Sequence, residues 1–120
     1  MFNLDLKNKV ILITGGSDGL GYASAELLSS EGAKVIICGR RGDYLNEKAK
    51  TISEKTNNNV LAIQADVSKA EDCKRLVEET ISKFKKIDIL VNNAGASAAA
   101  LFEDVSDKNW EDDINLKLMS

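Results

Sequence analysis

Short apolar runs alternate along the chain with longer segments in which apolar residues recur every three or four positions. Four runs have the length of strands and are apolar on both faces, at residues 9–14, 34–38, 60–64 and 87–91. The segments between them, and one after the last run, have the apolar spacing of helices. Strands of this kind alternating with helices indicate a parallel sheet that is covered on two sides.

Local signals bound the first two predicted helices. The first is expected over residues 20–31, because Gly32 then provides a stop signal. The second is expected to begin at Asp43, a suitable N-cap residue, and to end at the polar residues 56–59.

Capping signals also mark the later helices. Ser68 and Glu71 have the spacing of a capping box for the third helix. Its apolar stripe consists of Cys73, Leu76, Val77, Thr80, Ile81 and Phe84. A last helix is expected to begin at Ser106, with Trp110, Ile114 and Leu118 at four-residue spacing.

Right-handed crossovers between parallel strands make this pattern an α/β, doubly wound parallel sheet of the Rossmann type. The expected strand order is 3-2-1-4, and the sequence ends after the helix that follows strand 4. In such a sheet a nucleotide binds where the strand order reverses, which is between strands 1 and 4.

A glycine-rich turn, Thr14-Gly15-Gly16-Ser17-Asp18-Gly19-Leu20-Gly21, joins the first strand to the first helix. Glycines let the backbone turn sharply and approach phosphates closely. The helix N-terminus then offers unpaired N–H groups and a partial positive charge to an anion. An ordinary strand-to-helix turn is the alternative, but the flanking elements favour a dinucleotide pyrophosphate site.

Composition narrows the class of protein further. The 120 residues are enough for one compact domain, and 43% of them are hydrophobic. The net charge is -3 with no basic stripe, so we expect no nucleic-acid partner. The apolar runs are too short to span a bilayer, and residues 1–5 do not resemble a signal peptide. Histidine is absent and the two cysteines lack a metal-binding spacing, so we expect a cytoplasmic protein without a metal site or disulfide.

Three motifs together resemble the classical short-chain dehydrogenase/reductase family, and more closely its 3-oxoacyl-carrier-protein reductase branch. The first is Thr14-Gly15-x-x-x-Gly19-x-Gly21, with that family's glycine spacing. The second is Asp66-Val67 after the third strand, and the third is Asn92-Asn93-Ala94-Gly95 after the fourth. The resemblance runs from about residue 6 to residue 120. It implies that residues 1–120 form the NADP-binding Rossmann half-domain and lack the C-terminal catalytic part.

The resemblance also implies a role for each matching position. The backbone of four loop residues should face the ribose and pyrophosphate, namely Ser17, Asp18, Gly19 and Leu20. The Asp66 carboxylate should bind the adenine amine, and the Val67 backbone should meet the ring. Three residues should line the cleft, namely Asn92, Ala94 and Gly95. Helix capping by Asp66 and turn formation by Asn92 and Asn93 are the structural alternatives.

The preferred cofactor follows from charge. In NAD-binding folds an acidic residue about 20 positions after the glycine motif binds the ribose 2′-hydroxyl. Here that stretch contains Arg40 and Arg41 and no carboxylate. Guanidinium groups bind phosphate through bidentate, charge-assisted hydrogen bonds. We therefore expect NADP(H) in preference to NAD(H), unless both arginines are solvated loop residues. Some NADP-preferring relatives have a second phosphate contact from a basic residue in the turn. Position 17 is a serine here, so that contact is missing.

The family's reaction is the transfer of hydride between the nicotinamide and a carbonyl or alcohol substrate. The resemblance places its serine and its Tyr-x-x-x-Lys pair beyond Ser120, and it assigns the asparagine of the proton relay to Asn115. A polar helix residue is the alternative for Asn115. A Tyr-x-x-x-Lys does occur at Tyr44 and Lys48, but its place after the second strand favours an exposed pair on one helix face.

Several functions remain compatible with these observations. The chain is expected to belong to an oxidoreductase acting on a small carbonyl or alcohol, inactive by itself, and to form a homo-oligomer. A non-catalytic NADP-binding module and a degenerate remnant are the alternatives. The chain could be part of a longer protein, one of two chains, or the product of a truncated gene. If strand 4 is the last strand, residues 87–91 form an apolar edge that is prone to aggregation.

Overall fold

The computed structural model describes residues 5–93, 100–103 and 117–119. Five strands and three helices of twelve or more residues follow one another in this part of the chain, and residues 100–103 are helical as well. In chain order they are β1 (Val10–Thr14), α1 (Gly19–Ser30), β2 (Lys34–Gly39), α2 (Gly42–Thr56), β3 (Leu61–Gln64), α3 (Ala70–Phe84), β4 (Ile89–Asn92) and β5 (Lys117–Met119). The elements predicted up to residue 92 are therefore present, with ends shifted by a few residues.

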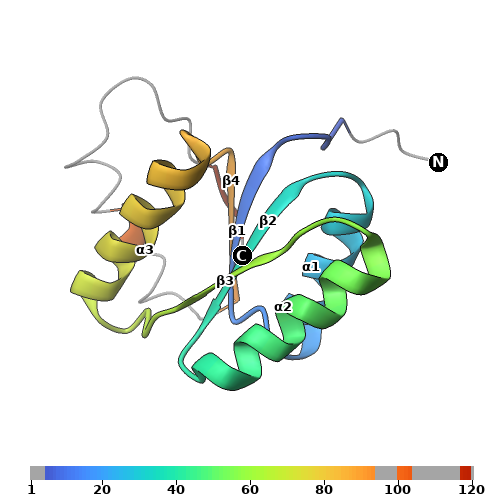
Figure 1. Cartoon of the computed structure of the whole chain (residues 1–120). Coiled ribbons are helices and arrows are strands. Elements are labelled where there is room, and N and C mark those ends of the chain that lie inside the picture. Colours follow the sequence, from blue (N-terminus) through green and yellow to red (C-terminus); the bar gives the residue numbers. More distant parts are fainter. Residues whose placement is uncertain (1–4, 94–99, 104–116, 120) are drawn as a thin grey trace.

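The strands form one parallel sheet in the order β3-β2-β1-β4-β5, which contains the expected order 3-2-1-4. Helices α1 and α2 cover one face of the sheet, and α3 covers the other (Figure 1). The fold is therefore the predicted doubly wound α/β sheet.

Side-chain alternation along the strands divides the core into two layers. Leu12 and Ile36 pack in the layer under α3, together with Leu76 of that helix. Their strand neighbours Ile13 and Ile37 pack in the other layer, under α1 and α2. Since consecutive side chains of a strand point to opposite faces, a strand buried on both faces has to be apolar throughout.

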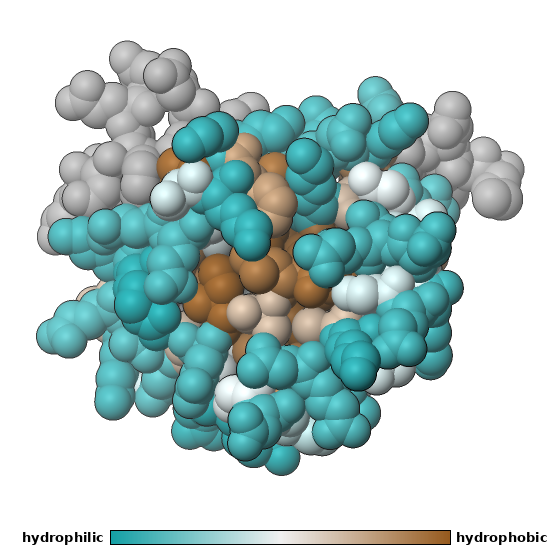
Figure 2. All heavy atoms as spheres, in the orientation of Figure 1, coloured by the Kyte–Doolittle hydropathy of each residue, from teal (hydrophilic) through white to brown (hydrophobic). Residues whose placement is uncertain are grey.

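One face of the molecule has apolar atoms at its centre. Figure 2 shows them over β3, between α2 and α3, with hydrophilic side chains around them. This is the end of the sheet where β3 pairs with β2 alone in the described part of the chain.

The structure corrects two predictions about the C-terminal part. Leu118 lies in β5 and not on a helix, and Leu90 of β4 is its partner across the parallel pair. Because β5 pairs with β4, β4 is an inner strand and not the exposed edge expected from the sequence. The other residues assigned to the last helix, Ser106, Trp110 and Ile114, lie outside the described residues.

Two capping predictions are also wrong. The N-cap of α2 is Arg41, and Asp43 lies in the first turn instead. The N-cap of α3 is Lys69, without a side-chain cap, because Ser68 donates its hydrogen bonds to Asp66. Capping patterns do not take account of a competing acceptor nearby.

Within the described residues, no helix is long and apolar enough to cross a membrane.

Candidate functional site at the carboxyl end of the sheet

The glycine-rich turn lies against the end of β2. The N–H groups of Gly15 and Gly16 donate to the Cys38 carbonyl oxygen at 3.1 and 3.3 Å. Gly15 and Gly19 have φ values of 66° and 55°, which glycine adopts more readily than other residues. The turn is therefore held in a conformation that suits glycine at both positions.

Close packing explains two further glycines. A Cβ atom on Gly21 would lie 2.1 Å from the Gly15 carbonyl oxygen, and one on Gly16 would lie 2.6 Å from Ile37 side-chain carbons. Asp18 is the N-cap of α1 but its side chain does not cap the helix, and the first turn contains no acidic residue. The turn and helix therefore form a close-packed backbone cradle whose positive end suits an anion.

The Asn92-Asn93 pair is joined to this turn through Thr14. The Thr14 hydroxyl donates to Asn92 Oδ1 at 2.9 Å and accepts the Asn93 N–H at 2.9 Å. Thr14 and Asn92 are both buried. The hydroxyl therefore links the ends of β1 and β4, the two strands between which the strand order reverses. Ala94, Gly95 and Asn115 lie outside the described residues, so their predicted roles stay predictions.

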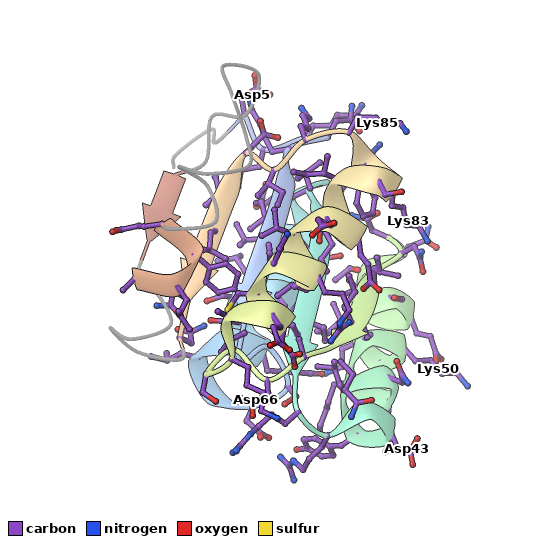
Figure 3. The ribbon with its side chains drawn as sticks, turned by 90° about the vertical axis from the view of Figure 1, so that its left-hand side faces the viewer. Asp5, Asp43, Lys50, Asp66, Lys83 and Lys85 are labelled. Carbon is purple, nitrogen blue, oxygen red and sulfur yellow. The ribbon has the colours of Figure 1, made fainter. Side chains whose placement is uncertain are left out.

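A cavity of about 600 Å³ opens beside the turn. It brings together residues from the ends of three strands: Gly15, Ser17, Cys38, Gly39, Arg40, Arg41, Ala65, Asp66, Val67 and Ser68. Figure 3 shows Asp66 at this end of the molecule, opposite Asp5 and Lys85. Six of the predicted cofactor residues thus line one cavity, while Thr14 and Asn92 are buried.

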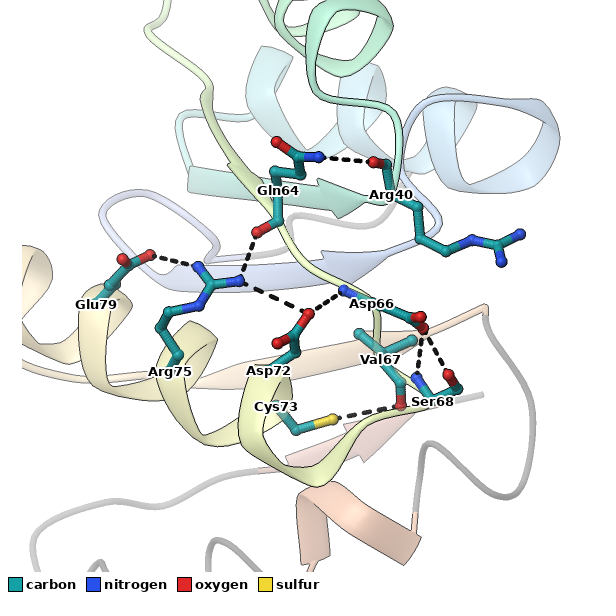
Figure 4. Close-up of polar contacts among 9 residues, drawn as sticks. All are labelled: Arg40, Gln64, Asp66, Val67, Ser68, Asp72, Cys73, Arg75 and Glu79. Carbon is teal, nitrogen blue, oxygen red and sulfur yellow. Dashed lines mark hydrogen bonds and ion pairs between the residues drawn. The ribbon is translucent and has the colours of Figure 1, made fainter.

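Asp66 is held in a tight turn at the cavity wall (Figure 4). Its Oδ1 accepts hydrogen bonds from the Ser68 hydroxyl at 2.6 Å and the Ser68 N–H at 3.0 Å. These bonds from Ser68 lower the pKa of Asp66, so its carboxylate stays ionised. Its own N–H donates to Asp72 Oδ2 at 2.7 Å. The sequence did not predict this contact of Asp72, whereas the Asp-x-Ser spacing was the available signal for the role of Ser68.

The two arginines differ in their partners. Arg41 Nη2 lies 3.0 Å from Asp18 Oδ2, and its guanidinium lies 4.2 Å from the centre of the Tyr44 ring. Tyr44 also donates its hydroxyl to Asp18 Oδ1 at 2.6 Å. Arg40 is exposed, and no ion pair within the described residues involves its guanidinium, although its charge contributes to lowering the pKa of Asp66. The cavity therefore has one unpaired guanidinium and one that is neutralised.

Tyr44 has a role that the sequence did not predict. The spacing of Tyr44 and Lys48 predicted an exposed pair on α2, but Tyr44 is half-buried and contacts the glycine-rich turn through Asp18. The Lys48 ammonium lies 5.1 Å from the Tyr44 ring centre. Tyr44 thus lies at the end of α2 that is near the cavity. Its contact with Asp18 was not predicted because the two residues are far apart in the sequence.

Chemically, the cavity offers hydrogen-bond donors, cations and one ionised carboxylate. Burial raises the pKa of Cys38 to about 12, so this lining thiol is neutral. In the described ranges there is no group of three histidine, cysteine or acidic side chains that could hold a metal ion. The cations and hydrogen-bond donors of the lining suit an anionic ligand.

Comparisons with known proteins agree with this geometry. Residues 9–120 match the short chain dehydrogenase family. The sequence is 38% identical over 107 residues to 11-beta-hydroxysteroid dehydrogenase A of Sesamum indicum, covering 89% of this chain and 31% of that protein. L-sorbose reductase of Gluconobacter frateurii, in complex with NADPH and L-sorbose, is similar in structure with a TM-score of 0.78 at 33% identity.

The cofactor named for structural neighbours varies. The L-sorbose reductase match covers 83% of this chain and 46% of the reductase. An NADH-dependent reductase responsible for alginate metabolism has a TM-score of 0.76 at 26% identity, covering 86% of this chain and 51% of that one. The chain thus spans between about a third and half of the length of these three proteins. With the family match extending over nearly all of its residues, this chain belongs to the short-chain dehydrogenase family of oxidoreductases.

Proposed function

We propose that this chain supplies the NADP(H) site of an oxidoreductase that interconverts a small carbonyl compound and an alcohol. The observation that carries the cofactor preference is the pair Arg40 and Arg41 at the cavity, next to the end of β2. No acidic side chain occupies this stretch, where NAD-binding folds place the carboxylate that binds the 2′-hydroxyl. A 2′-phosphate is the group that best matches two guanidiniums.

The fit of a dinucleotide rests on the backbone cradle. The close approach of Gly21 to Gly15 leaves no room for side chains where a pyrophosphate would meet the N-terminus of α1. The ionised Asp66 and the half-buried Val67 would hold the adenine at the other side of the cavity. A bound nicotinamide would supply or accept the hydride.

The remaining predictions from the sequence are part of the same proposal. Asn115 is proposed as the asparagine of the proton relay, with Asn92, Ala94 and Gly95 along the cofactor cleft. The relatives are two to three times longer than this chain, so the catalytic serine and Tyr-x-x-x-Lys are proposed to lie in the part they have in addition. A cytoplasmic homo-oligomer is the proposed working form.

The experiment is a titration of the purified protein with NADPH and NADH, comparing the wild type with Arg40→Asp. We expect NADPH affinity to fall about ten-fold or more in the variant, because a charge-assisted bond to phosphate becomes a repulsion. NADH affinity should stay within about two-fold, since NADH lacks the 2′-phosphate.

Lys50→Asp is the matched control. It makes the same change of net charge on an exposed residue of α2, outside the cavity lining. This control should leave both affinities unchanged. Equal losses of NADPH and NADH affinity in Arg40→Asp would contradict the assignment of the 2′-phosphate to this arginine. Absence of binding by the wild type would favour a remnant without function.

A further inference from the structure

The carboxylate of Asp18 links the glycine-rich turn to the start of α2. Its Oδ2 pairs with Arg41 Nη2 at 3.0 Å, and its Oδ1 accepts the Tyr44 hydroxyl at 2.6 Å. The Arg41 guanidinium also lies over the Tyr44 ring, 4.2 Å from its centre. These three side chains, which we call the Asp18 cluster, hold Arg41 in one place through two kinds of contact.

The Asp18 cluster is exposed. The side chains of Arg41 and Asp18 are 67% and 60% accessible to solvent. Ion pairs with this exposure contribute little to the stability of a fold, because water screens them. An anion with a larger charge can therefore compete with Asp18 for Arg41.

The cluster lies at the arginine end of the cavity. Arg41 is one of the lining residues, beside Arg40 and Gly39. A ribose 2′-phosphate carries between one and two negative charges near neutral pH. At this end of the cavity it would meet one unpaired guanidinium, one guanidinium held by a carboxylate, and that carboxylate itself.

We propose that Asp18 is a specificity-determining residue that limits the affinity for a 2′-phosphate by holding Arg41. Binding a 2′-phosphorylated dinucleotide then requires Arg41 to exchange the Asp18 carboxylate for the phosphate. A dinucleotide with a free 2′-hydroxyl makes no such demand. This inference rests on the proposed cofactor site, and it makes Asp18 a restraint on the preference that Arg40 and Arg41 create.

The test compares wild type, Asp18→Asn and a control in titrations with NADPH and NADH. The asparagine keeps the shape of the side chain and removes its charge. We expect Asp18→Asn to raise NADPH affinity about three- to five-fold, the upper range of one exposed ion pair, with NADH affinity within about two-fold of wild type.

Asp43→Asn is the matched control, because it removes the same charge from an exposed side chain of α2 with no ion pair in the described part of the chain. It should leave both affinities unchanged. Arg41→Ala completes a double-mutant cycle. Arg41→Ala should lower NADPH affinity more in the Asp18→Asn background than in wild type, because Arg41 is available to the phosphate only when the Asp18 charge is absent. Asp18→Ser is a second uncharged variant should the asparagine perturb the turn.

Each other outcome overturns the inference in a recognisable way. An unchanged ratio of NADPH to NADH affinity, in a protein that binds both, would show that Asp18 does not limit the phosphate site. A selective loss of NADH affinity would make Asp18 an acceptor for the 2′-hydroxyl instead. Failure of wild type and variants to bind either dinucleotide would overturn the proposed function itself, and the inference with it.

Discussion

At the scale of single residues, the Thr14 hydroxyl is the buried contact that ties β1 to the end of β4. It donates to Asn92 Oδ1 and accepts the Asn93 N–H, both at 2.9 Å. We predict that Thr14→Val lowers the free energy of unfolding by about 1–3 kcal/mol, because the valine removes both hydrogen bonds that the hydroxyl makes to Asn92 and Asn93. Urea denaturation of both proteins measures the difference.

Thr14→Ser is the control for this contact, because serine keeps the hydroxyl and loses only a methyl group. Of the free energy of unfolding that Thr14→Val loses relative to wild type, Thr14→Ser should keep more than half. Equal destabilisation by serine and valine would assign the effect to packing of the methyl group and not to the hydrogen bonds.

At the scale of elements, the open edge of β3 is protected by a side chain of α3. Arg75 Nη2 donates to the Gln64 carbonyl oxygen at 2.8 Å, and Arg75 also pairs with Asp72 and Glu79 (Figure 4). An edge strand with unpaired backbone groups is a template for pairing with another chain. Arg75 therefore occupies one acceptor that such pairing would use.

We predict that Arg75→Ala lowers the free energy of unfolding by about 1 kcal/mol and increases aggregation, since the Gln64 carbonyl loses its partner. Urea denaturation and light scattering check the two effects. Lys74→Ala removes a neighbouring exposed cation of the same helix and should change neither. Similar behaviour of the two variants would mean that the charge of α3, and not the bond to β3, is what matters.

At the scale of the whole molecule, burial of two thiols couples stability to alkaline pH. Burial raises the pKa of Cys38 from 9.0 to about 12 and that of Cys73 from 9.0 to about 11. Unfolding restores the ordinary value, so above pH 9 the unfolded chain loses thiol protons that the folded chain keeps. The stabilisation is thus complete below about pH 9 and is lost as the pH rises towards the folded values.

The prediction is a fall in the free energy of unfolding between about pH 9 and pH 12 that is smaller in Cys38→Ala/Cys73→Ala. The cavity left by the missing sulfurs lowers stability at every pH, whereas the thiol titration changes only the slope. Urea denaturation at a series of pH values gives both. Identical slopes for the variant and wild type would show that the thiols do not contribute to the pH dependence.

Local patterns were sufficient for most of the fold. The apolar runs predicted four strands, and the glycine spacing placed the turn of residues 14–21 between β1 and α1. The reason is that a strand buried on both faces must be apolar, and that a left-handed or close-packed backbone position admits glycine. The positions of Arg40, Arg41 and Asp66 near one edge followed in turn, because parallel strands end at the same side of the sheet.

Contacts between distant segments were beyond these patterns. Folding brings together the residues that pair β5 with β4, and it brings Asp18 beside Arg41. Ser68 differs, because a nearby acceptor, the Asp66 carboxylate, competes for its hydrogen bonds. Periodicity reports which face of an element is buried but not which element lies beside it. A hydrogen bond or ion pair depends on a few ångströms between two side chains, and that distance exists only once the sheet has brought their elements together.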